Sequence, residues 1–506
     1  MCGAVSLNAA AQAPPQVDAD AALSLEDVLR ITLRDNPSIL VAARQSDAEH
    51  GALVAAGDPF DPKVQTAFGR NRFSELQADL SASPWLDVSQ TQYSIGVQQQ
   101  LRRGVLVAPE LSVSRTALPA LAIQPTSQAT AKLTLVVPLL KDRGGFVTSA
   151  PERAASRAYE ASRFQTDHVT AQSVLSAVTA YWDYQAAIVR LEVLTDSEAR
   201  ARRLLDDTRR LVEAGERPPS DLTQVRGNAA AKRVTRVSAE QAVVDARVRL
   251  GLVMGLGPAE TAALRLAATP FPAADAAATA PASMPAVPAL LSDALGRRPD
   301  LLAATKNVES ARMLFDAARE NLKPRVDLVT SVGYAGLQIG GGSLGSLFSP
   351  IFRNVPGPNV SVSFRYQRAT ANVGALGQLL QTEAGYAQQR IAEQELQREI
   401  RIGVYQASES IGRNAAAMAD AHEAVAFYQE MVRSEQRKFQ LGVSTLFDTI
   451  QSADALTSVR LSEIDAGRQY AVALATLRFQ TGSLVTTGPQ GATVDVNRLL
   501  RLRIAD

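Results

Sequence analysis

The feature that most constrains the fold is an internal repeat, because the same landmarks occur twice in the same order. The aligned pairs are Leu33 with Leu295, Pro37 with Pro299, Pro62 with Pro324, Gly215 with Gly442, and Asp221 with Asp448. A repeat of this kind indicates two structurally similar halves. The first half is longer between its second proline and its glycine, so it carries an insertion there.

Alternating apolar and polar residues predict β-strands in both halves. The alternating runs are 93–101, 105–116, 133–137, 326–334 and 360–366. A period of two places one set of side chains on an apolar face and the other on a polar face. The apolar face can pack against another sheet or face lipid. The Gly-rich run 340–345 lacks the Lys-Ser/Thr of a phosphate-binding loop, so it is interpreted as a loop.

Two long segments predict helices, from about Ala150 to Ala214 and from about Ala369 to Leu441. Apolar residues recur there in alternating steps of three and four, which is typical of coiled-coil packing. At 1.5 Å per residue such helices are roughly 90 to 105 Å long. Helices of this length do not fit in a compact domain and must project from the strands.

Each long helix ends at a glycine, Gly215 in the first half and Gly442 in the second. Glycine is favoured at a helix C-terminus because it adopts positive φ without strain. The polar residues that follow, Ser220 or Asp221 and Ser444 or Thr445, are candidate N-caps of a returning helix. We therefore predict two helical hairpin tips, although turn chemistry alone would also account for these residues.

Composition excludes several classes of function. The chain has 52 Lys and Arg against 51 Asp and Glu, a net charge of +1 that gives no reason to expect a nucleic-acid partner. Its single cysteine, Cys2, excludes an intrachain disulfide. Its three histidines are far apart in sequence, which argues against a zinc site. No catalytic motif was found, so we expect no catalytic, metal or cofactor-binding residues.

The start of the chain has the character of a processed segment. Ala11-Gln-Ala13 fits the small-x-small pattern of a secretory cleavage site and precedes Pro14. We interpret residues 1–20 as the end of a truncated signal peptide. Two alternatives remain: Cys2 carries a lipid, or the segment is simply a disordered start.

Taken together, these patterns resemble the TolC family of outer-membrane channel proteins, which serve drug efflux and type I secretion. The resemblance runs from about Leu25 to Ser483. It rests on the paired prolines, on the Val137–Gly144 segment where a strand gives way to a long helix, and on the two glycine tips. It implies a mainly α fold with a β-barrel portion, built from two tandem repeats. A homotrimer would share a 12-stranded barrel, about four strands per protomer, and an α-helical periplasmic tunnel.

The expected organisation follows from the repeat. We expect a first repeat at 21–256, with strands about 63–139 and a tip at 215–221. A Pro/Ala linker at 257–289 follows, then a second repeat at 290–484, with strands about 325–367 and a tip at 442–448, and a tail at 485–506. The runs 93–101 and 105–116 can form an extra hairpin, but the sequence leaves its position open.

Site residues follow from the resemblance only where the letters match. The family's acidic ring implies a channel constriction at Asp448, with Gln451 at the family's second acidic position, Asp454 one turn further, and Asp221 in the first tip. The tips imply adaptor docking through Gly215, Glu216, Arg217, Ser220, Gly442, Val443, Ser444, Thr445 and Leu446.

The family's closing contact to the first tip uses an Arg or a Tyr of the second tip. Ser444 and Phe439 occupy those positions here. A closed state must therefore use other groups, such as Arg217 and Glu216.

The function implied is a passive outer-membrane exit duct that works with an inner-membrane transporter and a periplasmic adaptor. It would carry small molecules in efflux, or proteins in type I secretion, and the sequence does not separate the two. One alternative is a coiled-coil periplasmic or extracellular adaptor or structural protein without a channel. Another is a secreted enzyme on a coiled-coil stalk, which the missing motifs disfavour.

Overall fold

The computed structural model describes residues 22–76, 85–118, 123–273, 286–341, 349–351, 357–488 and 491–500. The expectations for residues 1–20 lie outside these ranges. The chain divides into two compact units. The strand unit comprises Ala42–Thr166 and Pro299–Glu399. The helical unit comprises Met1–Val41, Asp167–Arg298 and Ile400–Asp506.

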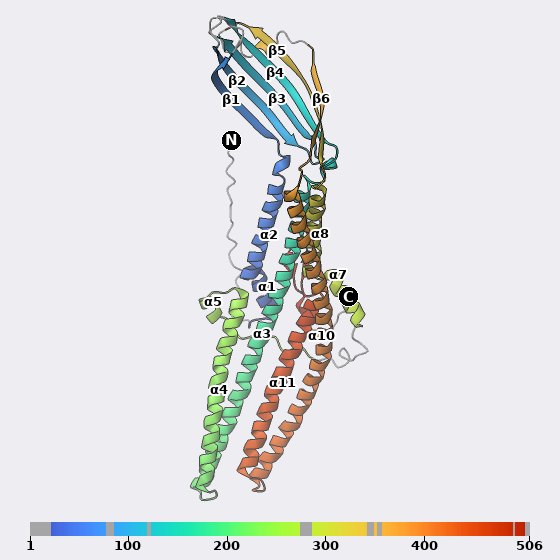
Figure 1. Cartoon of the computed structure of the whole chain (residues 1–506). Helices are drawn as coiled ribbons and strands as arrows, with labels where there is room; N and C mark the ends of the chain where they lie inside the picture. The colour runs from blue at the N-terminus through green and yellow to red at the C-terminus, as the bar shows by residue number, and fades with distance from the viewer. Residues whose placement is uncertain are drawn as a thin grey trace. The chain divides into compact units, whose positions relative to one another are not determined.

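The strand unit is built around one antiparallel sheet with the strand order β1-β2-β3-β4-β5-β6 (Figure 1). The strands are β1 (Lys63–Leu76), β2 (Trp85–Gln100), β3 (Leu106–Leu118), β4 (Ile123–Pro138), β5 (Arg325–Ile339) and β6 (Asn359–Gln367). Strands from both repeats thus share the sheet, because β4 of the first pairs with β5 of the second. β1 and β6 form its two edges.

The extra hairpin lies within this sheet, between β1 and β4. Its turn is closed by a hydrogen bond from the Leu101 N–H to the Val105 carbonyl, 2.8 Å long. The described residues therefore place six strands in the sheet, two more than the roughly four expected per protomer. The physical reason is the insertion in the first half, which supplies two full-length strands with a partner on each side.

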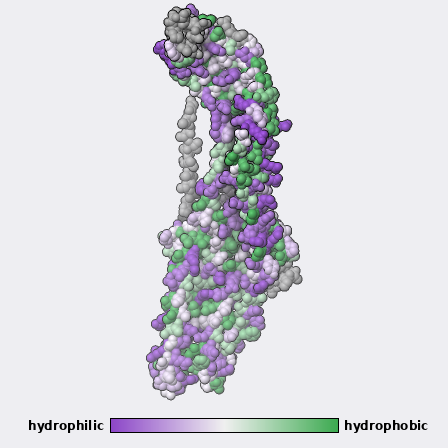
Figure 2. Space-filling model, in the orientation of Figure 1, coloured by the Kyte–Doolittle hydropathy of each residue, from purple (hydrophilic) through white to green (hydrophobic). Residues whose placement is uncertain are grey.

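One face of the sheet is mainly apolar, as the alternation predicts. Register places Val64, Phe68, Tyr93 and Ile95 on the same face as the apolar residues of β6, and Phe68 lies against Tyr93 at 4.9 Å between ring centroids. Much of this apolar surface is exposed in the single chain. In Figure 2, hydrophobic side chains gather over parts of the strands, whereas they intermingle with hydrophilic ones over the long helices. Such a face needs cover from lipid or from other protein.

Helices complete the strand unit. They are α8 (Pro299–Glu320) and the adjoining parts of α2 (Pro37–Ala56), α3 (Ala150–Glu213) and α10 (Val373–Gln440), with short 3-10 turns at Asp58–Phe60, Arg143–Gly145 and Ser349–Ile351. The Ser310 hydroxyl donates to the Ala154 carbonyl at 2.9 Å, and Thr305 donates to Glu393 at 2.8 Å. These contacts tie α8 to both long helices.

The helical unit consists chiefly of two hairpins, α3–α4 and α10–α11, with α4 at Pro219–Met254 and α11 at Leu446–Gln480 (Figure 1). Shorter elements are α1 (Leu25–Asp35), α5 (Pro258–Ala262), α7 (Val287–Arg297), β7 (Thr486–Gly488), β8 (Gly491–Thr493) and α12 (Val496–Leu500). The long helices α3 and α10 have nearly the bounds expected from the apolar periodicity. None of the helices in the described ranges is both long and apolar enough to cross a membrane.

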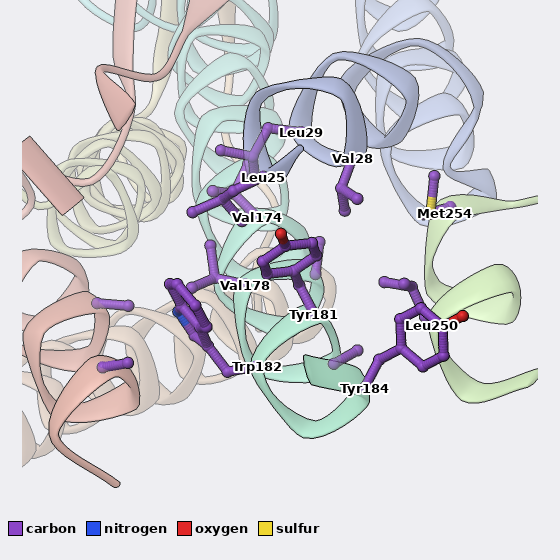
Figure 3. Close-up of a cluster of buried hydrophobic side chains, with 14 of the residues drawn as sticks. Leu25, Val28, Leu29, Val174, Val178, Tyr181, Trp182, Tyr184, Leu250 and Met254 are labelled. Carbon is purple, nitrogen blue, oxygen red and sulfur yellow. The ribbon is translucent and has the colours of Figure 1, made fainter. Parts of the chain in front are cut away.

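The core of the helical unit forms where α1 crosses α3 and α4 (Figure 3). Three aromatic residues of α3, Tyr181, Trp182 and Tyr184, are almost completely buried there among aliphatic side chains of α1 and α4. The Tyr181 hydroxyl donates to the Leu23 carbonyl at 3.2 Å and accepts from the Thr269 N–H at 3.0 Å. The segments before α1 and after α5 are therefore fastened to the middle of α3.

Candidate functional site

The first hairpin tip joins α3 to α4 through Gly215. This glycine has φ +79° and open space around it, and the Glu216 N–H donates back to the Leu211 carbonyl at 2.9 Å. These features form a glycine-terminated helix end. α4 then begins at Pro219, with Pro218 at the N-cap position and no side-chain cap. The expected cap from Ser220 or Asp221 is wrong, because proline suits the first helical position and moves the helix start ahead of both residues.

The second tip joins α10 to α11 and repeats the same helix end. Gly442 has φ +74°, and the Val443 N–H donates to the Lys438 carbonyl at 3.0 Å. Thr445 is the N-cap of α11 and exchanges hydrogen bonds with Asp448: its hydroxyl accepts from the Asp448 N–H at 3.2 Å, and its N–H donates to the carboxylate at 3.3 Å. Leu446 is buried, so it supports this tip from inside.

The two tips touch each other within one chain. The guanidinium of Arg217 lies over the Phe439 ring, 4.8 Å from its centroid, and also pairs with Asp221 at 3.7 Å. Phe439 is one of the two positions at which the family resemblance implies a closing Arg or Tyr. The contact between the two tips is thus a cation–π interaction.

The four predicted constriction residues differ in their exposure and in their contacts. Asp448 is exposed and caps α11, Gln451 is exposed on the same helix, and Asp221 faces Arg217. Asp454 pairs with Lys232 of α4 at 2.7 Å. Of the four, Asp448 and Gln451 are the exposed residues, whereas Asp221 and Asp454 are half-buried.

Sequence reasoning missed a row of ion pairs that joins α3 to α11 above the tips. Asp183 pairs with Arg468 at 3.1 Å and Asp196 with Arg460 at 4.0 Å, and the Arg190–Asp465 pair lies between them. The acidic and basic partners fall in different repeats. These ion pairs depend on how the two helices align, and no local sequence motif indicates that alignment.

A buried carboxylate holds the first hairpin together. Glu198 of α3 is only 3% exposed and accepts from Arg202 of its own helix and from Arg236 of α4. Burial by itself raises the pKa of Glu198, but the hydrogen bond from Arg236 and the positive charges of Arg202 and Arg236 together hold that pKa below its usual range. The α3–α4 pairing near the tip therefore depends on an ionised carboxylate.

In the strand unit, the passage from β4 to α3 is built by the segment around Asp142. Asp142 adopts φ +65°, and its carboxylate accepts from the Val147 and Thr148 N–H groups at 2.8 Å each. Gly145 packs so closely against the β2–β3 turn that a Cβ would lie 1.9 Å from the Arg102 carbonyl oxygen. Arg102 also forms a two-pronged ion pair with Glu152 of α3. The extra hairpin is thus anchored at this junction.

Within the described ranges, no group of three or more His, Cys, Asp or Glu residues is arranged to hold a metal ion.

Comparison with known proteins identifies the relatives of this fold. Over 91% of this chain and 90% of its own, the structure of the outer-membrane channel OprN superposes with a TM-score of 0.68 at 15% sequence identity. VceC of Vibrio cholerae matches with a TM-score of 0.64 at 15% identity, over 90% and 96% of the two chains. CmeC of Campylobacter jejuni matches with a TM-score of 0.63 at 12% identity, over 91% and 85%. The predicted fold class is confirmed by these likenesses.

A sequence relative points in the same direction. The fusaric acid resistance protein FusA of Burkholderia cepacia is 29% identical over 196 residues, which are 39% of this chain and 35% of that protein. The aligned part thus spans about a third of the relative. The model of the outer membrane efflux protein family matches residues 28–256 and 290–483. The chain therefore belongs to the outer membrane efflux protein family.

Proposed function

We propose that the chain is a passive exit duct for small molecules in the outer membrane. The observation that carries this proposal is the architecture of each repeat, in which strands with one apolar face lead into a long helix that returns at a glycine-capped tip. The duct would act by opening and closing its tips.

Three copies of the chain would assemble to form the duct. The edge strands β1 and β6 have no neighbour on their outer sides in the described sheet, and β6 is exposed along its whole length. Unpaired edges with an apolar face favour closure against further strands. Three copies of a six-stranded sheet would bring eighteen strands to a closed wall, compared with the twelve implied by the family resemblance.

The tips would form the closing end and the docking surface. We propose that Asp448 and Gln451 face the passage as rings in the trimer, and that Gly215, Glu216, Arg217, Ser220, Gly442, Val443, Ser444 and Thr445 meet a periplasmic adaptor linked to an inner-membrane pump. The first tip is charged and stiffened by two prolines, while the second is small and apolar. An adaptor would therefore need two different contact surfaces.

Efflux of small molecules is preferred to protein secretion on one observation. The relative FusA is named for resistance to fusaric acid, a small molecule. We propose that this chain exports small toxic compounds.

The proposed function is tested by deleting the gene that encodes this chain from its host and measuring growth in the presence of a panel of small-molecule toxins. We expect sensitivity to rise for some of them, and expression of the full chain to restore growth. Unchanged sensitivity to the whole panel, together with loss of a secreted protein from the medium, would show that secretion is the function instead.

A further inference from the structure

A cavity of about 760 Å³ lies in the helical unit between the α3–α4 and α10–α11 hairpins. Its lining includes three arginines of α3: Arg200, Arg203 and Arg210. Apolar side chains line it as well, among them Leu204, Leu211 and Ile450. A volume of this size, with a mixed apolar and polar lining, is typical of small-molecule sites.

The charges in this cavity are unbalanced. Its lining has five basic side chains, the three arginines together with Arg217 and Lys232, but only two carboxylates, Asp207 and Asp454. Lys232 already pairs with Asp454, and Arg217 pairs with Asp221. Among the described residues, no carboxylate forms an ion pair with Arg200, Arg203 or Arg210, although the negative charges of Asp196 and Asp454 act on Arg200. Positive charge is therefore in excess in the lining.

Arg200 is the arginine of this lining whose surroundings stabilise its charge poorly. Its side chain is half-buried, and one terminal nitrogen donates to the Thr457 hydroxyl at 3.3 Å. Its Nε is buried and has no hydrogen-bond partner in the described part of the chain. Burial and the nearby Arg460 and Arg203 lower the pKa of the Arg200 guanidinium. A buried donor without a partner is costly, and an anion would satisfy it.

We propose that this cavity is a binding site for a small organic anion with an apolar body, such as an aromatic carboxylate. Guanidinium groups bind carboxylates through charge-assisted hydrogen bonds, often in pairs. The aliphatic lining would cover the apolar body, which a small inorganic anion would leave unused. The cavity is formed by one chain alone, so the proposal does not depend on assembly into a duct.

The test is calorimetric titration of 1-naphthoate into the purified full chain, with a titration into detergent alone subtracted. Wild type should bind saturably. Arg200→Gln, Arg203→Gln and Arg210→Gln should each weaken binding about tenfold, the effect of losing one hydrogen bond to a charged group. Arg413→Gln and Arg433→Gln serve as controls, because these arginines lie on α10 with side chains 79% and 66% exposed. They should leave the affinity unchanged.

A second comparison uses wild type alone, so it survives any failure of the variants to fold. 1-Naphthamide has the same body without the charge, and we expect it to bind at least about tenfold more weakly than 1-naphthoate. Equal binding of acid and amide, equal affinity of the three cavity variants and wild type, or no saturable binding of 1-naphthoate would each overturn the proposal.

Discussion

Lys232 of α4 and Asp454 of α11 form a 2.7 Å ion pair that joins the two hairpins of one chain just behind their tips. The Lys232 side chain is only 18% exposed, so this pair is better shielded from solvent than most ion pairs of the protein. Together with the Arg217–Phe439 contact it holds the hairpins side by side. We expect such contacts to bias an equilibrium between closed and open tips.

Asp454→Ala should therefore increase the time that the channel spends open. The substitution leaves Lys232 charged and partly buried without its partner, which disfavours the closed arrangement. Open probability in planar bilayers measures the effect. The matched control is Glu430→Ala, which breaks an exposed pair with Arg433 on α10 alone. If both variants open to the same extent as wild type, the pair has no part in closing the tips.

Asp448 combines a charge with a capping role, and two substitutions separate them. Asp448→Asn removes the charge but keeps an oxygen that can accept from Thr445. Thr445→Val removes the cap but keeps the charge. We expect the asparagine variant to lose cation preference, measured as a shift of reversal potential toward zero. We expect the valine variant to keep that preference and to lose helix stability, by about 1 kcal/mol for the cap. Unchanged selectivity in Asp448→Asn would remove Asp448 from the constriction.

Two adjacent glycines test the junction that anchors the extra hairpin. Gly144 and Gly145 have nearly the same positive φ, so alanine at either position meets a similar backbone cost. Only at Gly145 would the new methyl collide with the Arg102 carbonyl, since nothing lies within 4 Å of a Cβ at Gly144. Gly145→Ala should therefore be the more destabilising, by about 1 to 3 kcal/mol as for overpacked sites. Thermal unfolding followed by circular dichroism checks this, and equal midpoints would mean that the turn is not held there.

The buried Glu198 predicts a loss of hairpin stability in acid. Its pKa is lowered in the folded chain, so its contribution is present above the unfolded value of about 4.3 and is lost as pH falls through the lower folded value. Glu198→Gln should be less stable than wild type at neutral pH, and this difference should shrink below about pH 4. The thermal unfolding midpoints of wild type and Glu198→Gln, measured from pH 7 to pH 3, test this prediction. A difference that stays constant with pH would show that Glu198 contributes packing and not charge.

Much of the fold was predictable because it depends on periodicity. Steps of three and four placed the ends of α3 and α10 close to their observed positions, although α10 begins at Val373 and not at Ala369. Alternation located strands on both sides of Arg102. The position of the extra hairpin was not predictable, because alternation shows which face a side chain takes but not which strand lies beside it. Its inclusion in the sheet depends on pairing with β1 and β4.

The candidate site was predictable only in part, since its contacts join distant segments. Gly215 and Gly442 mark the two tips because positive φ is a local demand of the chain. The contacts of Arg217 with Phe439 and of Lys232 with Asp454 connect different repeats and depend on how the helices align. The cap formed by Thr445 and Asp448 was predictable only for Thr445, which is a candidate N-cap in the sequence. The sequence indicates no capping role for Asp448, which the family resemblance places at the constriction.

The central claim is that three copies of the chain form one conducting passage, and one measurement tests it most directly. The detergent-purified protein is weighed by native mass spectrometry, and the same fraction is then added to a planar bilayer. We expect a mass three times that of the 53.9 kDa chain and small conductance steps that Asp454→Ala lengthens. A monomer that needs no detergent and gives no conductance would contradict the claim and favour a coiled-coil protein without a channel.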